Sequence, residues 1–471
     1  MNFDHFFPVS KKQKVTAGLV GAGQFGASLI NQATLMPMLD VPFLCDLNIE
    51  LAKKAFSDAG VAEEDIFYAD NKKAALSAFE LGKKVITDDY RLVCELPADI
   101  IVEATGQPEA AASIAYLALT SGYHVAMVTK EADSVVGPYL SRIASQNGKF
   151  ITPVDGDQPS LLIGLMSWAG LLGLDILAAG KSSEYDFIYY PERDIVSWRG
   201  HEKHLPDFKD AWAMGDDIQA KLEMRARLLD GFPQRTVPDL CEMGIVCNHT
   251  GLLPDVADFH APHARVGEVA DIFSPRSRGG IVASTGRVDV FNCLRRADEQ
   301  SFAGGVYVVV DCKGVESWKI LKEKGIPMHK DGRSALLYNP SHLLGVEAPI
   351  SLLSTVLLEK PSGAITLEHH VDLHACTTKA WKKGQLLRIT DQHHHEVDGL
   401  KPLLQAASPA RSDKPLPYYM AAGQMLACDV PAGTIITREM ITPPADSQLF
   451  SLRDVMGAWL SPGTNAGFLG V

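Results

Sequence analysis

The chain lacks closely spaced cysteines and long hydrophobic segments. Its eight cysteines are scattered, and no two of them form a Cys-x-x-Cys pair, so neither a disulfide framework nor a zinc site is expected. No apolar run reaches the ~20 residues that a membrane span requires. Residues 1–14 show no apolar core followed by a small-residue cleavage site, as a signal peptide would. These absences predict a reduced, cytoplasmic protein without membrane contact.

Basic charge is also scarce. The 471 residues include 44 Lys and Arg against 57 Asp and Glu, which gives a formal net charge of −13. A nucleic-acid-binding surface needs clustered basic residues, so we expect no nucleic-acid partner. With 46% hydrophobic and 21% charged residues, the composition is that of a globular protein. The length allows roughly three domains of about 150 residues each.

What the sequence does contain is a glycine-rich loop near its start. The apolar run at 15–20 is followed at once by Gly21-x-Gly23-x-x-Gly26, and the next apolar run ends at Asp46. This order of strand, glycine loop, helix, strand and acid is that of a dinucleotide-binding site. Gly21 allows a tight turn, Gly23 leaves room for a pyrophosphate, and Gly26 lets the helix pack closely. Asp46 is suited to accept hydrogen bonds from a ribose diol.

Helix-like and strand-like segments alternate through the first third of the chain. Helices are expected at 49–59, 72–81, 110–121 and 135–147, and strands at 99–106, 124–128 and 149–154. Crossover helices between apolar strands predict an α/β fold with a doubly wound parallel sheet. We therefore assign residues 1–155 to an NAD(P)-binding Rossmann domain.

The pattern changes after residue 155. A helix is expected at 161–172, strands at 174–179, 280–284 and 305–311, and a helix at 347–358 that returns to the Rossmann domain. Residues 181–231 are polar and aromatic, and they either line a substrate cleft or form a surface loop. From residue 361 onward, short strands and turns predominate. We predict a central α+β catalytic and dimerisation domain (156–360) and a small β-rich domain (361–471).

Four charged residues are candidates for catalysis. Carbonyl reduction needs a group that protonates or polarises the developing alkoxide. Lys130 and Lys181 follow strand-like segments, and burial can lower the pKa of such a lysine toward neutrality. Asp157 lies where the first domain ends, and Glu242 shares an apolar helix with Asn248, where a carboxylate needs a partner. A solvated lysine, an Asp-Gly turn and a salt bridge are the respective alternatives.

Further polar residues are candidates for substrate binding. Arg276 and Arg278 lie in a compact loop with glycine and serine, and arginine suits bidentate recognition of phosphate or carboxylate. Asn248 and His342 are also candidates. The alternative for the arginines is a solvent-exposed loop.

Histidines cluster in the last third of the chain. Residues 393–395 are three adjacent histidines, which we expect in a surface loop, because alternating side chains cannot all reach one ion. His370, Asp372 and His374 would share one face of a strand, but nothing completes a tetrahedral zinc set. We expect no metal site there.

Eight stretches together resemble a known family. They are VGAGQFG (20–26), VEATG (102–106), HVAMVTKEADSVVGP (124–138), VDGDQPSLL (154–162), AAGKSSEYD (178–186), LCEMGIVCNHTGLLPD (240–255), YNPSHLLGVEAPISLLS (338–354) and LPYYMAAGQMLACDVPAGTIIT (416–437). On these the chain resembles the homoserine dehydrogenase-like oxidoreductases with a C-terminal SAF-type domain. Within that group it is similar to the deoxyxylulose-phosphate reductoisomerase-like enzymes.

The resemblance implies an NAD(P)-dependent oxidoreductase that acts on CH–OH groups and forms a homodimer or higher homo-oligomer. The cofactor would be bound by Gly21, Gly23, Gln24, Phe25, Gly26, Asp46, Thr105 and Gly106. Asp46 favours the free ribose diol of NAD, whereas Lys53 and Lys54 could meet the 2′-phosphate of NADP. Both cofactors stay open.

The implied reaction is the conversion of 1-deoxy-D-xylulose 5-phosphate to 2-C-methyl-D-erythritol 4-phosphate in isoprenoid precursor synthesis. The substrate would then be a small phosphorylated or anionic molecule. A homoserine dehydrogenase-type or sugar-acid dehydrogenase is the alternative, and a non-catalytic dinucleotide sensor is a third. The chain departs from the family pattern at residues 234–239. Many relatives carry a Gly-Thr-Lys shortly before the glutamate that matches Glu242, whereas this chain has Gln-Arg-Thr-Val-Pro-Asp at residues 234–239.

Overall fold

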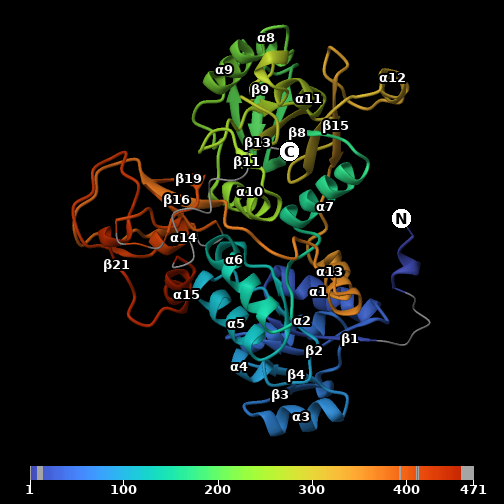
Figure 1. Cartoon of the computed structure of the whole chain (residues 1–471), viewed down its shortest axis with the longest axis vertical. Helices are drawn as coiled ribbons and strands as arrows, with labels where there is room; N and C mark the ends of the chain where they lie inside the picture. Colours follow the sequence, from blue (N-terminus) through green and yellow to red (C-terminus); the bar gives the residue numbers. More distant parts are fainter. Residues whose placement is uncertain (1, 8–13, 392–393, 410, 412, 458–471) are drawn as a thin grey trace. The chain divides into compact units, whose positions relative to one another are not determined.

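The computed structural model describes residues 2–7, 14–391, 394–409, 411 and 413–457 (Figure 1). They form two compact units. Unit 1 contains Met1–Ser160, Leu343–Lys401 and Ala406–Val471, and unit 2 contains Leu161–His342 and Pro402–Gln405. Among the described residues, no helix is long and apolar enough to cross a membrane. The division into three domains at residues 155 and 360 stays a prediction.

Unit 1 is built on a parallel sheet with the strand order β3-β4-β2-β1-β5-β6-β7. The strands are β1 (Val15–Val20), β2 (Leu39–Cys45), β3 (Ile66–Tyr68), β4 (Lys84–Thr87), β5 (Ile100–Glu103), β6 (His124–Met127) and β7 (Ile151–Pro153). The chain moves outward from β1 to β2 and later returns to β5, on the other side of β1. The order therefore reverses between β1 and β5, and ligands bind at the carboxyl ends of such a pair.

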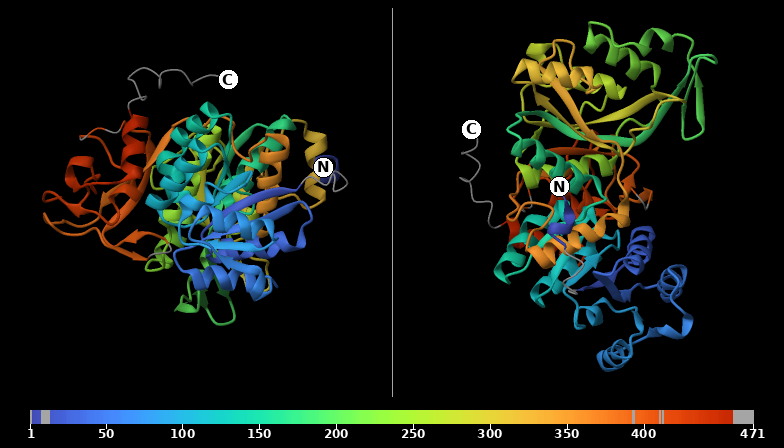
Figure 2. Two further views of the ribbon diagram at one scale, coloured as in Figure 1. Left: turned by 90° about the horizontal axis from the view of Figure 1, so that it is seen from below. Right: turned by 90° about the vertical axis from the view of Figure 1, so that its right-hand side faces the viewer.

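Helices connect these strands and flank both faces of the sheet (Figure 2). They are α1 (Gln24–Leu35), α2 (Ile49–Asp58), α3 (Lys72–Glu80), α4 (Tyr90–Val93), α5 (Pro108–Thr120) and α6 (Lys130–Gln146). Asn48, Asn71 and Asp89 cap α2, α3 and α4, since each side chain accepts a backbone N–H of the first turn. The predicted doubly wound Rossmann sheet is confirmed. The sixth helix starts at Lys130 rather than 135, so Lys130 opens a helix instead of ending a strand.

The return of the chain to the Rossmann sheet is also confirmed. Helix α13 (Ala348–Leu358) buries Ala348, Leu352 and Leu353 in one apolar cluster with Leu19 of β1 and Leu29 of α1. The helix follows the short 3₁₀ turn η6 (Leu344–Val346), which contacts α1. Residues more than 300 positions apart in the sequence thus share the core that supports the glycine loop.

The last part of unit 1 consists mainly of short strands. These are β16 (Val371–Thr377), β17 (Ile389–Asp391), β18 (Glu396–Val397), β19 (Leu400–Ala406), β20 (Met425–Leu426) and β21 (Ile441–Thr442), with the helices α14 (Tyr418–Ala421) and α15 (Gln448–Gly457). Arg453 of α15 donates to Asp372 of β16 at 2.6 Å and to the carbonyl of Val135 in α6 at 3.0 Å. Asp372, which the sequence placed on one strand face with two histidines, is thus bound by an arginine.

Unit 2 is built on a mixed sheet with the order β10-β9-β8-β13-β11, to which β12 adds on β13, β14 on β8 and β15 on β14. The strands are β8 (Ile176–Tyr190), β9 (Ile195–Trp198), β10 (His201–His204), β11 (Leu253–Pro254), β12 (His263–Ala264), β13 (Arg287–Arg296), β14 (Val306–Asp311) and β15 (Ser334–Asn339). The helices are α7 (Gln158–Leu171), α8 (Phe208–Trp212), α9 (Ile218–Leu228), α10 (Val237–Thr250), α11 (Val269–Ile272) and α12 (Val315–Glu323).

One of the two alternatives for residues 181–231, and one expected strand of unit 2, are wrong. Residues 181–231 are not a surface loop, because their aromatic side chains form a buried cluster that includes Tyr185, Phe187 and Phe208. Residues 280–284 are not a strand. Only Val282 forms a bridge, with Pro275, and a side chain on Gly280 would overlap the carbonyl of Ser274. That close approach makes the segment a tight turn instead of an extended run.

Candidate functional site

The glycine loop of unit 1 has the geometry of a phosphate-binding turn. Gly21 has φ +109°, and a Cβ there would overlap the carbonyl of Ala104. A Cβ on Gly26 would overlap the carbonyl of Gly21. In contrast, nothing lies within 4 Å of the Cβ position of Gly23. Gly21 and Gly26 are therefore required by the fold, whereas Gly23 leaves open space above the loop.

Helix α1 begins directly after this open space. Gly23 is its N-cap and makes no side-chain cap hydrogen bond. Gln24 and Phe25 are the first residues of the helix, so their backbone N–H groups belong to the uncapped end. A helix N-terminus of this kind is suited to bind a phosphate, because its N–H groups and dipole favour negative charge.

Asp46 follows β2 and lies against the glycine loop. Its carboxylate accepts the N–H of Ala22 at 2.8 Å and the N–H of Asn48 at 2.8 Å. The two lysines that could meet a 2′-phosphate both bind carboxylates, Lys53 binding Glu63 at 2.5 Å and Lys54 binding Asp58 at 2.5 Å. Asp46 thus lies beside the glycine loop, and Lys53 and Lys54 each form an ion pair with a nearby carboxylate.

Thr105 and Gly106 form the turn after β5, and a buried glutamate holds it. Glu103 accepts hydrogen bonds from the N–H of Thr105 at 2.8 Å, from its hydroxyl at 2.6 Å, and from the hydroxyl of Thr129 at 2.9 Å. Gly106 donates its N–H to the hydroxyl of Thr129 at 2.9 Å. Burial raises the pKa of Glu103 despite these bonds. The sequence reasoning did not select Glu103 or Thr129, although an acid ending an apolar strand was a usable signal.

The structure brings Lys130 and Asp157 together at the first residue of α6. The Lys130 Nζ atom lies 3.2 Å from the Asp157 Oδ1 atom, and the two side chains are 26% and 12% exposed. Glu131, the next residue, has a side chain that is 12% exposed, and desolvation raises its pKa to about 7 although Lys130 opposes the shift. An ammonium, a carboxylate and a carboxyl group that titrates near neutrality therefore lie side by side.

One of the three adjacent histidines, His395, lies beside Glu131. His395 is buried, with a side chain that is 5% exposed, and its Nδ1 atom is 3.7 Å from Glu131 Oε1. The prediction of a surface loop is wrong for this residue, because the hairpin β17–β18 turns its ring inward. His394 binds Asp391, and His393 lies outside the described residues.

Lys181 and Glu242 meet in unit 2, together with an acid that the sequence did not reveal. Lys181 Nζ lies 2.9 Å from Asp239 Oδ1 and also binds Glu242, and its side chain is 1% exposed. Ser183 donates its hydroxyl to Asp239 at 2.7 Å. Burial alone would lower the pKa of Lys181, but Asp239 and Glu242 outweigh it and raise the pKa. The expected shift toward neutrality is therefore wrong.

The remaining candidates of unit 2 are dispersed. Asn248 is buried on α10, and His342 Nδ1 is 3.1 Å from the carbonyl oxygen of Gly304. Arg278 donates to Asp311 at 2.7 Å, so its charge is already balanced. The Arg276 side chain is 62% exposed, and its Nε donates to the carbonyl of Ile281.

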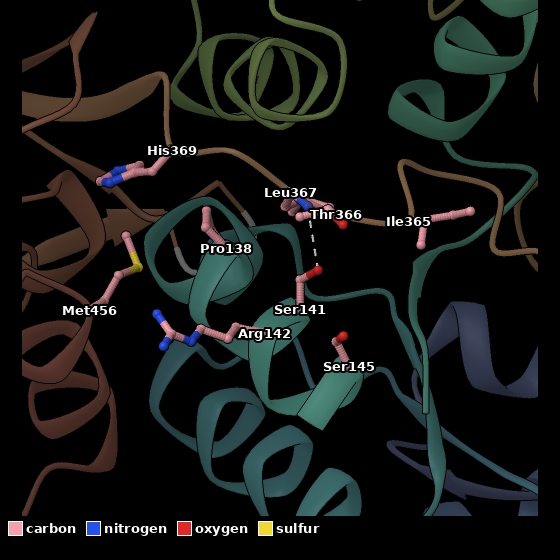
Figure 3. Close-up of a pocket in the computed structure, with 9 residues that line it drawn as sticks. All are labelled: Pro138, Ser141, Arg142, Ser145, Ile365, Thr366, Leu367, His369 and Met456. Carbon is pink, nitrogen blue, oxygen red and sulfur yellow. Dashed lines mark hydrogen bonds between the residues drawn. The ribbon is translucent and has the colours of Figure 1, made fainter. Parts of the chain in front are cut away.

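A separate cavity of about 290 Å³ lies in unit 1 between α6, residues 365–369 and α15 (Figure 3). None of the predicted site residues lines it. Its polar lining includes Ser141, Arg142 and His369. Within the part of the chain that the structure describes, no group of three or more His, Cys, Asp or Glu residues could hold a metal ion.

Comparisons with known proteins match two parts of the chain to family models. Residues 22–152 match the NAD-binding domain of homoserine dehydrogenase. Residues 156–348 match the catalytic domain of oxidoreductase DRL. Among curated proteins no sequence match was found.

Solved structures show only a distant likeness. An oxidoreductase domain protein from Kribbella flavida is 17% identical, with 37% of this chain and 42% of that chain covered and a TM-score of 0.27. A putative oxidoreductase, yvaA, from Bacillus subtilis is 12% identical, with 75% and 92% covered and a TM-score of 0.37. A probable dehydrogenase from Thermotoga maritima is 9% identical, with 74% and 90% covered and a TM-score of 0.37. The chain thus spans less than half of the length of the first of these proteins.

The glycine loop and the two family matches agree with each other. The residues that form the open turn, the uncapped helix end and the acid at β2 lie within or next to the matched NAD-binding segment. The matched catalytic segment covers Lys181, Asp239 and Glu242. The chain therefore contains an NAD-binding segment similar to that of homoserine dehydrogenase, followed by a segment similar to the catalytic domain of oxidoreductase DRL.

Proposed function

We propose that the chain catalyses the NAD(P)H-dependent conversion of 1-deoxy-D-xylulose 5-phosphate to 2-C-methyl-D-erythritol 4-phosphate, acting at a CH–OH group. The observation that carries this proposal is the match of residues 156–348 to the catalytic domain of oxidoreductase DRL. The resemblance of eight sequence stretches to the reductoisomerase-like enzymes supports the same reaction. The bound nicotinamide would supply the hydride for the reduction step.

In this proposal the residues of unit 1 bind and orient the nucleotide. The uncapped N–H groups of α1 and the open space over Gly23 suit a pyrophosphate. Asp46 suits a ribose diol, and Thr105 and Gly106, held by Glu103, form the second wall of the crevice at the β1–β5 switch point. Lys130 and Asp157 would then exchange or hold a proton at the reacting oxygen.

A specific observation favours the alternative, a homoserine dehydrogenase-type or sugar-acid dehydrogenase. A phosphate dianion needs uncommitted positive charge, but Lys181 is enclosed by two carboxylates and Arg278 binds Asp311. In the segment 234–239, which stands where many relatives carry Gly-Thr-Lys, Arg235 donates to the carbonyls of Asp258 and Phe259, and Asp239 binds Lys181. This charge balance suits a substrate with an ammonium or several hydroxyl groups.

An oxidation assay separates the two functions. Purified enzyme is mixed with NADH or NADPH and with deoxyxylulose 5-phosphate, aspartate semialdehyde or a sugar-acid ketone, and absorbance at the nicotinamide band is followed. The lead proposal expects oxidation only with the phosphosugar, and inhibition by fosmidomycin, a phosphonate that mimics it. Reduction of NAD(P) by homoserine would instead establish the alternative, as would oxidation with a sugar-acid ketone.

Several parts of the proposal come from the sequence. We propose a cytoplasmic homodimer or higher homo-oligomer, a SAF-like domain at residues 361–471 and a place in isoprenoid precursor synthesis. Sedimentation of the purified chain would measure the assembly state directly, and a monomer at micromolar concentration would contradict the dimer.

A further inference from the structure

The turn that follows β7 carries Asp157, and its backbone is tightly constrained. Val154 accepts the N–H of Asp157 at 3.2 Å, and Gly156, inside the turn, has φ +87°. A Cβ on Gly156 would overlap the carbonyl of Leu344, and the carbonyl of Gly156 accepts the N–H of Leu344 at 2.9 Å. The turn at residues 154–157 is therefore held by a segment that comes much later in the sequence.

Asp155, in the same turn, is the centre of a hydrogen-bond network with three serines. Its Oδ2 atom accepts the hydroxyls of Ser351 and Ser362, both at 2.9 Å. Its Oδ1 atom accepts the hydroxyl of Ser160 at 2.5 Å, and its backbone N–H donates to Ser351 at 2.6 Å. A carboxylate accepts several hydrogen bonds through its lone pairs, so the turn is fixed through both a side chain and the backbone.

The serines that bind Asp155 lie on well-packed parts of unit 1. Ser351 belongs to α13 and is fully buried, and this helix packs against the Rossmann sheet. Ser362 follows α13 and donates its N–H to the hydroxyl of the buried Thr152 in β7 at 2.9 Å. Asp155 and all of these partners belong to unit 1. The network therefore joins the end of β7 to the segment that returns to the sheet.

Asp157 lies two positions after Asp155, and its carboxylate makes the contact with Lys130. Its Oδ1 atom accepts the N–H of Gln158 at 3.0 Å and lies 3.2 Å from Lys130 Nζ. This second distance is already at the long end for a hydrogen bond, so a shift of about 1 Å in the turn would break the contact. The pair thus depends on the backbone that Asp155 fixes.

Asp155 is suited to act through the turn rather than on a ligand. Both of its carboxylate oxygens bind serine hydroxyls, so its acceptor positions are occupied by the protein. A positioning residue of this kind holds a neighbouring group in the geometry that the chemistry needs. The competing interpretation is that the network only fastens α13 to the sheet.

We propose that Asp155, bound by Ser351 and Ser362, is a positioning residue that holds Asp157 against Lys130. Its effect on turnover rests on the proposed function, in which Lys130 and Asp157 exchange or hold a proton at the reacting oxygen. Asp155 itself transfers no proton. Its removal should therefore change the chemical behaviour of Lys130, whereas loss of a simple anchor would lower stability and leave Lys130 unchanged.

The first test measures Lys130 directly and needs no substrate. The full chain is treated with acetic anhydride at one fixed pH, and mass spectrometry gives the acetylation rate of Lys130 relative to Lys72, whose side chain is 54% exposed. Only the neutral amine reacts, and a paired carboxylate favours the charged form. We expect Asp157→Asn to raise the ratio about threefold, as for loss of a partly hydrated ion pair. Asp155→Ala should raise it nearly as much.

A double variant shows whether Asp155 acts through Asp157. In the Asp157→Asn background, Asp155→Ala should not raise the acetylation ratio any further, because the contact is already lost. A further rise of the same size would mean that Asp155→Ala merely exposes Lys130, and it would overturn the proposal. An unchanged ratio in Asp155→Ala, with a lower free energy of unfolding, would do the same and would establish the anchor.

Two conservative variants sharpen this measurement. Asp155→Asn keeps the shape of the side chain and an acceptor for the serines, so the ratio should return close to the wild-type value. Ser362→Ala removes one hydrogen bond and should raise the ratio by a smaller amount. It decides the question if Asp155→Ala does not fold, since a wild-type ratio in Ser362→Ala would then contradict the proposal. Ser77→Ala, at an exposed position on α3, is the matched control.

The second test uses whichever compound the wild-type enzyme reduces. We expect Asp155→Ala to lower kcat by about 10-fold, because misplacement of a catalytic group is costly. KM and NAD(P)H affinity should stay unchanged, and Asp155→Asn should restore most of kcat. Wild-type kcat in Asp155→Ala would overturn the catalytic consequence. If the wild-type enzyme reduces none of the compounds, the proposed function fails, and the acetylation ratios still decide whether Asp155 positions Asp157.

Discussion

The two units each contain a lysine bound to carboxylate, and the two pairs differ in exposure. In unit 1, Lys130 and Asp157 are 26% and 12% exposed and 3.2 Å apart. In unit 2, Lys181 is 1% exposed and binds both Asp239 and Glu242, which are 3% exposed. One pair is partly hydrated at the start of a helix, and the other is enclosed between a strand and α10.

The difference separates a role in ligand binding from a role in the fold. A partly hydrated ion pair contributes roughly 0–1 kcal/mol to stability, so it can rearrange when a ligand arrives. A buried pair costs several kcal/mol to desolvate, and removing one partner leaves the other charge uncompensated. We therefore expect substitution of Lys130 to lower turnover, and substitution of Lys181 mainly to lower the free energy of unfolding.

The largest effect is expected from Lys181→Ala. The substitution leaves Asp239 and Glu242 buried without their cation, and such a loss typically costs about 3–5 kcal/mol of unfolding free energy. Denaturant unfolding followed by circular dichroism measures it. An assay of turnover alone would be misleading here, because partial unfolding also lowers activity.

A triple variant controls this prediction. Lys181→Met with Glu242→Gln and Asp239→Asn removes all three charges, so most of the lost stability should return. If Lys181→Ala unfolds at the wild-type denaturant concentration, the three side chains do not form the buried network, and the contrast between the two lysines disappears.

In contrast to Lys181→Ala, a variant in the glycine loop is expected to keep its fold and to lose cofactor binding. Gly23→Val adds a branched side chain in open space, so the fold should persist, but the space that a pyrophosphate needs is filled. We expect NAD(P)H affinity to fall about 10³-fold, or roughly 4 kcal/mol, in calorimetric titration. Gly21→Val is the matched comparison and should destabilise the fold, because its Cβ overlaps Ala104. Unchanged affinity in Gly23→Val would contradict the site.

Local patterns predicted the parallel sheet and its loop because each signal lies within a few residues. Apolar runs gave the strands, and the spacing of Gly21, Gly23 and Gly26 gave the turn. The return of α13 to the sheet could be expected from its apolar composition. Each of these depends on burial of side chains that neighbours in the sequence already specify.

Partners that are distant in the sequence could not be predicted. Asp239 follows a proline in a polar segment, and nothing near it indicates Lys181, which is 58 positions away. His395 and Glu131 meet only because a hairpin brings them together. The predicted direction of the Lys181 pKa shift was wrong for the same reason. The pKa is raised by two carboxylates that the sequence alone does not place beside the lysine.

Lys130→Met tests the exposed member of the comparison. The variant keeps the length of the side chain but removes the charge, so the unfolding free energy should change by less than about 1 kcal/mol. Turnover should fall by roughly 10²-fold if Lys130 donates to or stabilises the reacting oxygen. Lys72→Met, at an exposed position on α3, is the control. Wild-type turnover in Lys130→Met would leave the lysine as a surface ion pair and no more.

The smallest effect is expected from Asp46→Ala, and it concerns the choice of cofactor. Asp46 lies at the end of β2 with its carboxylate against the loop, while Lys53 and Lys54 are bound to Glu63 and Asp58. A carboxylate accepts hydrogen bonds from a ribose diol but repels a 2′-phosphate, so we propose a preference for NADH. The variant should bind NADH about 10-fold more weakly, close to 1.4 kcal/mol, and NADPH no more weakly than before. Calorimetric titration of both nucleotides into wild type and variant measures the ratio. If NADPH loses more affinity than NADH, Asp46 does not contact the ribose, and unit 1 must discriminate the cofactors through another residue.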